Sequence, residues 1–183
     1  LSMQNYHDVY GQFPSGTHEN DELEPDQRLS WLADILPFVD EAPLYDQIDF
    51  EKAWDDEANS AAVQMPIPVY LNPGIAADET DERGARTDYV GIAGLGEDGP
   101  NLPADDKKAG VFAYNRVTRI RDIRDGTSNT IAVGEASSDF GPWAAGGKPS
   151  IRPFTKKPYI KGQDGIGGRS AGGRNFDCAA GSV

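Results

Sequence analysis

The stretch that says most about the fold is DIRDGTSNTIAVG, residues 122–134. Within it, Asp125-Gly126 precedes Thr127 and Ser128, a combination that is typical of a tight turn. The aspartate carboxylate can accept hydrogen bonds from backbone N–H groups two residues on, and glycine supplies a positive φ. The apolar, β-branched run at 130–134 then favours a strand. The stretch therefore predicts a turn that enters a strand, and the functional alternative for the same turn is a loop that binds a cation or an anion.

Further strands are predicted on both sides of this turn. The runs at 89–93 and 111–114 have strand composition. The alternation in 175–183 predicts a last strand that returns to the sheet, with Phe176 and Cys178 on its inner face. Residues 117–123 fit either a short helical turn or a strand, and we favour the turn. The three prolines of 66–73 predict an extended segment at a sheet edge.

Helical periodicity is confined to the first third of the chain. Residues 1–11 have the pattern of the last turns of a helix that Gly11 ends. A second helix is predicted from a cap at Asp26 to a stop at Pro37, and a short third helix at 55–63. Because the chain opens inside the first helical pattern, we interpret it as a fragment or a processed form.

These elements together predict an α+β fold in a single domain, residues 1–183. The 21 glycines and 13 prolines favour a β-rich domain with long loops over a helical one. We expect the first helix to pack on an antiparallel sheet of four or more strands.

The formal charge of −13 limits the partners that the chain can have. A surface of this sign repels nucleic acid and anionic membranes, so we expect no nucleic-acid partner. The single cysteine, Cys178, cannot close a disulfide within the chain. No window approaches the length of a membrane span.

The acidic clusters raise the question of calcium. None has the spacing of an EF-hand loop, and a solvated surface explains each cluster more simply. We therefore expect weak calcium binding at most and no other cofactor. If a site exists, its ligands are expected in one of two sets, either Asp78, Asp81 and Asp88 or Asp122 and Asp125.

The sequence contains no pattern that indicates an enzyme. His7 and His18 are the only histidines, and neither zinc-ligand spacing nor a Gly-x-Ser-x-Gly elbow is present. A surface or packing role is the expectation for both histidines. Among the tryptophans, Trp143 is the one suspected of exposure, as a possible carbohydrate platform.

Several stretches resemble one family. They are LSMQNYHDVYGQFP (1–14), LSWLADILPF (29–38), DYVGIAG (88–94), DGTSNT within 122–135, and GPWA (141–144). The family is a group of paralogous planctomycete proteins that have a prepilin-type N-terminal cleavage/methylation signal and a C-terminal His-(nine residues)-Asp-Gly signature. It is catalogued as a domain of unknown function and sometimes labelled solute-binding.

Two departures from the family pattern are visible. Ser170 and Ala180 stand where the terminal signature has its His and Asp, and only Gly181 and the flanking Gly172-Gly173 remain. Asn72 stands before Pro73 where the family often has Cys, so Cys178 lacks one conceivable partner.

The resemblance implies a pilin-like or pseudopilin-like head domain, with residues 1–11 as the end of its N-terminal helix. Such a subunit is anchored in the inner membrane before processing, lies in the periplasm or outside the cell, and assembles with itself or other pilin-like subunits. The expected function is that of a non-catalytic structural or assembly subunit of a pilus-like or type II secretion-like filament. The alternative is an envelope module that binds a solute, a glycan or calcium.

Overall fold

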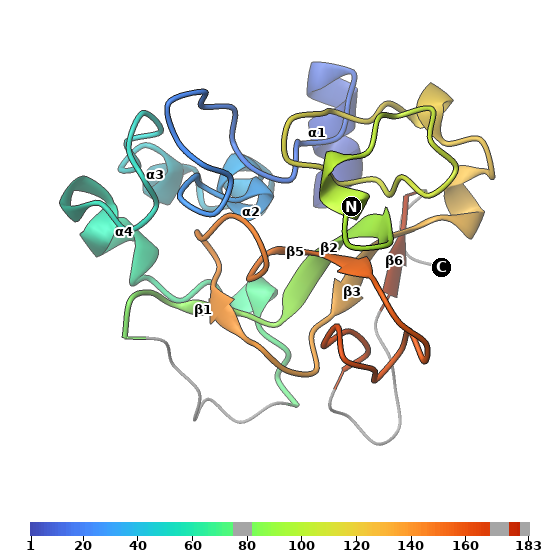
Figure 1. The fold of residues 1–183 in the computed structure, drawn as a ribbon. Helices are drawn as coiled ribbons and strands as arrows, with labels where there is room; N and C mark the ends of the chain where they lie inside the picture. The colour runs from blue at the N-terminus through green and yellow to red at the C-terminus, as the bar shows by residue number, and fades with distance from the viewer. Residues whose placement is uncertain (75–81, 169–175, 180–183) are drawn as a thin grey trace.

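The computed structural model describes residues 1–74, 82–168 and 176–179, and its fold is α+β, as predicted (Figure 1). Short helices dominate the first third of the chain, and a sheet follows. The α-helices are α1 (Ser2–Tyr10), α2 (Trp31–Asp34), α3 (Ala42–Tyr45) and α4 (Ser60–Val63). The 3₁₀ turns are η1 (Leu36–Phe38), η2 (Glu57–Asn59), η3 (Pro68–Tyr70), η4 (Gly99–Asn101), η5 (Ile120–Asp122) and η6 (Thr127–Asn129).

The main sheet has four strands in the order β5-β2-β3-β6. They are β2 (Tyr89–Leu95), β3 (Ile131–Glu135), β5 (Ile151–Phe154) and β6 (Phe176–Cys178). β3 runs antiparallel to β2 and β6, but β5 runs parallel to β2, so the expectation of an antiparallel sheet is wrong for one pair. The reason is the connection: residues 136–150 carry the chain from the end of β3 past the start of β2. β5 therefore begins at the same end of the sheet as β2.

A second, two-stranded sheet lies within that connection. It pairs β1 (Arg86–Thr87) with β4 (Gly141–Pro142), antiparallel. Through this pairing, β4 fixes the connection 136–150 to β1, which directly precedes β2. The connection can therefore cross from β3 to the opposite edge of β2.

The predicted strand at 111–114 is wrong. The backbone N–H groups of Gly110 and Phe112 donate to Ala93 and Ile92 at 3.1 and 3.2 Å, beyond the part of β2 that pairs with β3. The segment then leaves the sheet, because the fully buried Phe112 packs on Trp31 with ring centroids 4.7 Å apart.

Most of the helical expectations hold, with changed bounds. α1 ends at Gly11, whose φ is 70°, and η2 with α4 occupies the third predicted helix. The second helix begins at Trp31 under a cap from Ser30, not at Asp26, because Leu29 and Ser30 form β-bridges with Ala145 and Thr17. Residues 117–123 contain η5 as predicted, whereas the segment predicted as extended contains η3.

α1 packs mainly on η1, and it also reaches the end of β6. Met3 is buried in the main core, and Gln4 donates its side-chain N–H to the Ala179 carbonyl at 3.4 Å. β6 lies where a last strand is predicted, and its Cys178 is half-buried.

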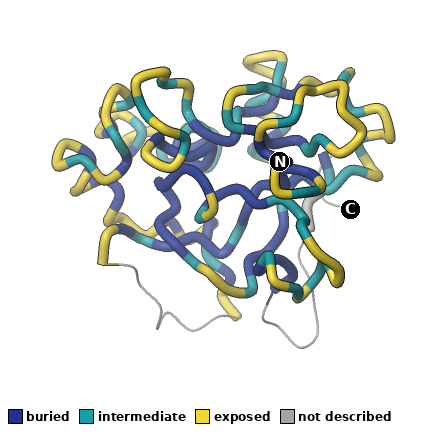
Figure 2. Tube along the Cα trace, viewed as in Figure 1, coloured by how far each residue is buried: buried dark blue, intermediate teal, exposed yellow. Residues whose placement is uncertain are grey.

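The core lies on both faces of the sheet (Figure 2). The larger cluster fills the space between the sheet and the helices and includes Trp31, Phe112 and Trp143. The smaller cluster consists of Val90, Ile92, Ala136 and Ile166. Successive residues of a strand point to opposite faces of the sheet. Val90 and Ile92 therefore pack in the smaller cluster, whereas Gly91 faces the larger cluster and lies under the ring of Phe112.

Candidate functional site

The structure describes three of the five aspartates proposed as calcium ligands. Asp78 and Asp81 lie outside the described residues. Asp88 is fully buried between β1 and β2, whereas the half-buried Asp122 ends η5 and the exposed Asp125 precedes η6. The structure therefore separates a buried carboxylate from a surface pair.

Asp88 is committed to protein partners. Its Oδ2 accepts the Asn72 backbone N–H at 2.7 Å, and its Oδ1 lies 3.1 Å from Arg86 Nε. Burial raises the pKa of Asp88, as does the charge of Glu135, and the Asn72 N–H and the Arg86 guanidinium offset part of that rise. A carboxylate held in this way ties the loop at 72 to the start of β2, which is a structural role.

Glu135 completes this buried polar cluster of Asn72, Arg86, Asp88 and Glu135. The Asn72 side-chain amide donates to Glu135 Oε1. The Glu135 carbonyl accepts the Gly167 N–H at 2.7 Å, and a side chain at position 168 would collide with the Glu135 carboxylate. The cluster thus joins β1, both central strands and the loop at 167–168. Sequence analysis missed it, although a carboxylate directly before one strand and another at the end of the next was the available signal.

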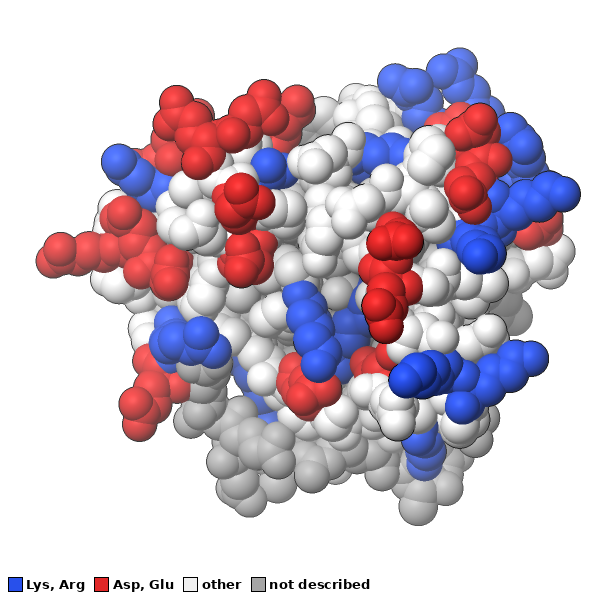
Figure 3. Space-filling model, in the orientation of Figure 1, with Lys and Arg blue, Asp and Glu red and all other residues white. Residues whose placement is uncertain are grey.

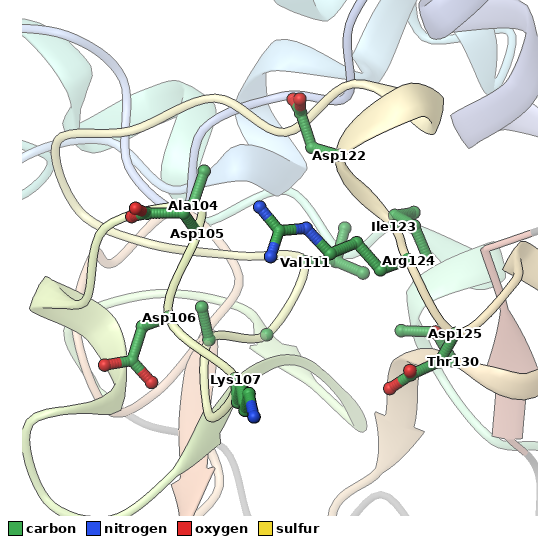
Figure 4. A pocket seen from close by; sticks show the side chains of 12 residues that line it. Ala104, Asp105, Asp106, Lys107, Val111, Asp122, Ile123, Arg124, Asp125 and Thr130 are labelled. Carbon is green, nitrogen blue, oxygen red and sulfur yellow. The ribbon is translucent and has the colours of Figure 1, made fainter.

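A surface pocket brings Asp122 and Asp125 together with a second loop (Figure 4). Its volume is about 420 Å³, and it lies between residues 104–111 and 122–130. The charged residues that line it are Asp105, Asp106, Lys107, Asp122, Arg124 and Asp125. The side chain of Arg124 extends into the space between the two loops, and the carboxylates around it do not converge on one point (Figure 4).

The pocket is therefore a mixed-charge surface rather than a cation cage. Calcium requires six to eight oxygen ligands around one position. Asp122 already accepts the Arg119 backbone N–H at 2.9 Å. In the part of the chain that the structure describes, no three His, Cys, Asp or Glu side chains are grouped so that they could hold a metal ion.

The turn between Asp122 and β3 has the conformation that the sequence predicts. Gly126 has a φ of 87°. The Asn129 side-chain amide donates to the Asp125 carbonyl at 3.0 Å, and the Thr130 hydroxyl donates to the Gly126 carbonyl at 3.1 Å. Side chains after the turn hold it through its carbonyls, whereas the prediction assigned this role to the Asp125 carboxylate.

The two histidines differ in their surroundings. His7 packs on Phe13, with ring centroids 5.0 Å apart. His18 Nδ1 lies 2.7 Å from Asp34 Oδ1, in an ion pair that the sequence analysis did not foresee. Burial alone lowers the pKa of His18, but the hydrogen bond and charge of Asp34 outweigh it and raise the pKa. Burial also raises the pKa of Asp34, and His18 opposes that rise.

Trp143, the tryptophan suspected of exposure, lies in the core. It is 0% exposed, and its indole N–H donates to the Met65 carbonyl at 3.0 Å. Trp31 and Trp54 are also buried, and each donates its indole N–H to a backbone carbonyl at 2.9 Å. The tryptophans thus join distant loops, and none forms a carbohydrate platform.

A family model described as "Protein of unknown function (DUF1559)" matches residues 1–175, nearly the whole chain. The chain belongs to this family. No curated protein and no solved structure matches it.

The surface of this family member around α1 is apolar and basic. Leu1 and Val9 are 82% and 65% exposed, and Ile120 of η5 is also exposed. A shallow depression beside them is lined by His7, Gly11, Arg119, Ile120 and Arg121. None of the helices in the described ranges is long and apolar enough to span a membrane.

Proposed function

We propose that the protein is a non-catalytic structural or assembly subunit of a pilus-like or type II secretion-like filament. In this proposal the chain is a pilin-like head from a planctomycete, and α1 is the end of a longer N-terminal helix. That helix carries the prepilin-type signal and anchors the subunit in the inner membrane until it is processed. The head then lies in the periplasm or outside the cell.

The observation that carries the proposal is the distribution of apolar residues around α1. Met3 and Tyr6 pack inward, and the ring of Tyr10 lies 4.5 Å from that of Tyr6. At about 100° per residue, Val9 falls on a flank of the helix, roughly a quarter-turn from the inward-facing residues, and Leu1 caps the helix on the far side; both are exposed. A helix with apolar residues on two sides is suited to a second partner, and neighbouring helices in a filament would supply one.

Substitution of Val9 by Asp in the full-length protein tests the filament role in its native cells. We expect Val9→Asp to abolish recovery of the protein in sheared surface filaments, because it places a charge in the helix contact. Val69→Asp is the matched control, since Val69 is 57% exposed on η3. Immunogold electron microscopy reports incorporation, and the melting temperature of each purified head reports folding.

Two results would count against the filament role. One is that the wild-type protein is absent from any filament. The other is that Val9→Asp and Val69→Asp are incorporated as well as the wild type.

A second candidate is an envelope module that binds a solute, a glycan or calcium, and the mixed-charge pocket in Figure 4 supports the solute form of it. Lys107 and Arg124 stand opposite carboxylates, so the pocket suits a small solute that carries both charges. Calorimetry with calcium, neutral oligosaccharides and free amino acids discriminates among these ligands. Binding at a 1:1 ratio would establish this candidate if Arg124→Ala abolishes it for an amino acid or an oligosaccharide, or if Asp122→Asn with Asp125→Asn abolishes it for calcium; no binding up to 1 mM (about −4 kcal/mol) would reject it.

A further inference from the structure

The charge of the chain is divided between two parts of its sequence. Residues 19–57 contain fourteen Asp and Glu but only Arg28 and Lys52, so they account for nearly all of the formal charge of −13. Residues 101–183 contain thirteen Lys and Arg against eight Asp and Glu. A chain that is acidic overall therefore has a basic second half.

The fold keeps these charges on different sides of the molecule. Acidic side chains gather over the helices at the upper left of Figure 3, and basic ones over its right side. We call the exposed carboxylates of 19–57 the acidic side. They are Glu19, Asp21, Glu22, Glu24, Asp26, Asp40, Asp46, Asp49, Glu51, Asp55 and Glu57.

The basic side comes from three segments, 107–108, 119–124 and 156–161. It consists of Lys107, Lys108, Arg119, Arg121, Arg124, Lys156, Lys157 and Lys161. Asp105, Asp106, Asp122 and Asp125 lie among them, so the basic side carries an excess of positive charge rather than positive charge alone.

The arginines of the basic side are available to a partner. Arg119, Arg121 and Arg124 are exposed and form no ion pair with any residue that the structure describes. Arg116, in the same stretch, is instead turned inward, and its guanidinium donates to the Leu102 and Gly110 carbonyls at 3.0 and 2.9 Å. Exposed apolar Ile120 lies between Arg119 and Arg121. An apolar centre with a charged rim is the usual composition of an interface.

We propose that the basic side of one copy binds the acidic side of a second copy, head to tail. This inference rests on the proposed function, since it names the surfaces through which neighbouring heads would meet. A contact between two different sides of identical chains is heterologous, so it propagates to an open chain unless the rotation closes a ring. The same property makes it suited to a filament.

A second copy fits better than an anionic polymer or membrane. Both of those would be repelled by the overall charge of −13. Another copy is repelled too at long range, but at about 0.1 M salt the Debye length is roughly 10 Å, so only the facing sides interact. Association should therefore be strongest near 0.1 M salt and fall toward 1 M, where the Debye length is about 3 Å.

Charge reversal tests the contact with the 183-residue chain in sedimentation velocity at 0.1 M salt. The basic-side variant is Arg119→Glu with Arg121→Glu and Arg124→Glu. The acidic-side variant is Asp21→Lys with Glu22→Lys and Asp55→Lys. The control is Glu82→Lys with Glu97→Lys and Asp98→Lys, three exposed acids outside both sides.

The wild type should show a mean mass that keeps rising with protein concentration. Each side variant alone should associate at least about tenfold more weakly than the wild type, because attraction becomes repulsion at one side. An equal mixture of the two variants should regain association, since the reversed sides complement each other. The control should behave like the wild type.

Several outcomes overturn the contact. They are a wild-type mass that stays at one copy up to 1 mM, a mass that stops at two copies, and a mixture that fails to associate. A further such outcome is that the basic-side variant associates as well as the wild type but loses binding to phosphatidylserine vesicles, which would assign the basic side to a membrane.

The failure of this contact can be told apart from the failure of the filament role. If Val9→Asp abolishes filaments while these reversals have no effect, the head-to-tail contact fails and the filament role stands. If the reversals behave as expected but the protein is absent from filaments, the filament role fails and the contact stands.

Discussion

At the scale of single residues, two glycines are required for different reasons. Gly126 holds a φ of 87°, and a Cβ there would meet only the Asn129 amide, at 3.6 Å. Gly91 lies in β2, and a Cβ there would stand 2.6 Å from the ring of Phe112. The first position constrains the backbone conformation, whereas the second constrains the space above the sheet.

Alanine at each position should separate these causes. Gly126→Ala should lower the free energy of unfolding by about 1 kcal/mol, through backbone strain that no neighbouring change can relieve. Gly91→Ala should lower it by about 1–3 kcal/mol through overpacking, and Phe112→Leu added to it should recover part of that loss. Urea denaturation measures both, and an equal effect of Phe112→Leu on the two alanine variants would contradict this distinction.

The His18–Asp34 pair should make stability depend on pH. The pKa of His18 is raised above its ordinary 6.5 in the folded state, so its contribution is complete below about 6.5. That contribution is lost as the pH rises through the raised pKa. The free energy of unfolding should therefore fall as the pH rises above about 6.5, and Asp34→Asn should flatten this fall. A wild-type slope unchanged in Asp34→Asn would contradict the role of the pair. The pKa of Asp34, raised above 3.8, acts in the same direction in the acidic range.

At the scale of elements, the loops around β5 are held by one buried arginine. Arg152 is 1% exposed and donates to the Ser138, Gly165 and Asp139 carbonyls at 2.9, 2.8 and 2.7 Å. Its Nε donates to the Lys148 carbonyl at 3.0 Å. Burial lowers the pKa of Arg152 to about 10, which leaves it charged at neutral pH. The guanidinium thus connects β5 to the loops at 138–139 and 164–165.

Loss of this guanidinium should be costly. Arg152→Met would leave several buried carbonyls without donors, at about 1–3 kcal/mol each, so the domain should lose at least about 3 kcal/mol of unfolding free energy. Arg152→Lys should recover only part of the loss. The carbonyls are arranged around the planar guanidinium of arginine, and the single ammonium group of lysine cannot reach all of them. Arg121→Met on the surface is the control for loss of a positive charge. Denaturation midpoints equal for Arg152→Met and Arg121→Met would show that Arg152 does not hold these loops.

At the scale of the whole molecule, repulsion among the carboxylates of the acidic side lowers the stability of the folded protein. Eleven exposed carboxylates between residues 19 and 57 repel one another, and salt screens that repulsion. Raising NaCl from 10 mM to 0.5 M should therefore raise the melting temperature by a few degrees. The acidic-side variant should melt higher than the wild type at low salt and respond less to salt. An equal salt response of the two proteins would show that repulsion within the acidic side does not lower the stability.

The amino-acid sequence by itself determined the features that local interactions control. The turn at Gly126, the strands on either side of it, the last turns of α1 and the acidic character all follow from residues within a few positions of one another. The mixed-charge pocket was not predicted, because Asp122 and Asp125 were named only as weak calcium candidates, and Asp105 and Lys107 come from another stretch of the chain.

Tertiary packing alone decided how distant segments meet. Asn72 and Glu135 are 63 residues apart and His18 and Asp34 are 16 apart, so no local pattern could pair them. Residues 111–114 have strand composition, yet burial of Phe112 on Trp31 draws them off the sheet. The edge of β2 opposite β3 is taken by β5, which arrives parallel because its connection crosses one end of the sheet. Propensity acts over a few residues, whereas the burial of large side chains and the path of each connection depend on the whole fold.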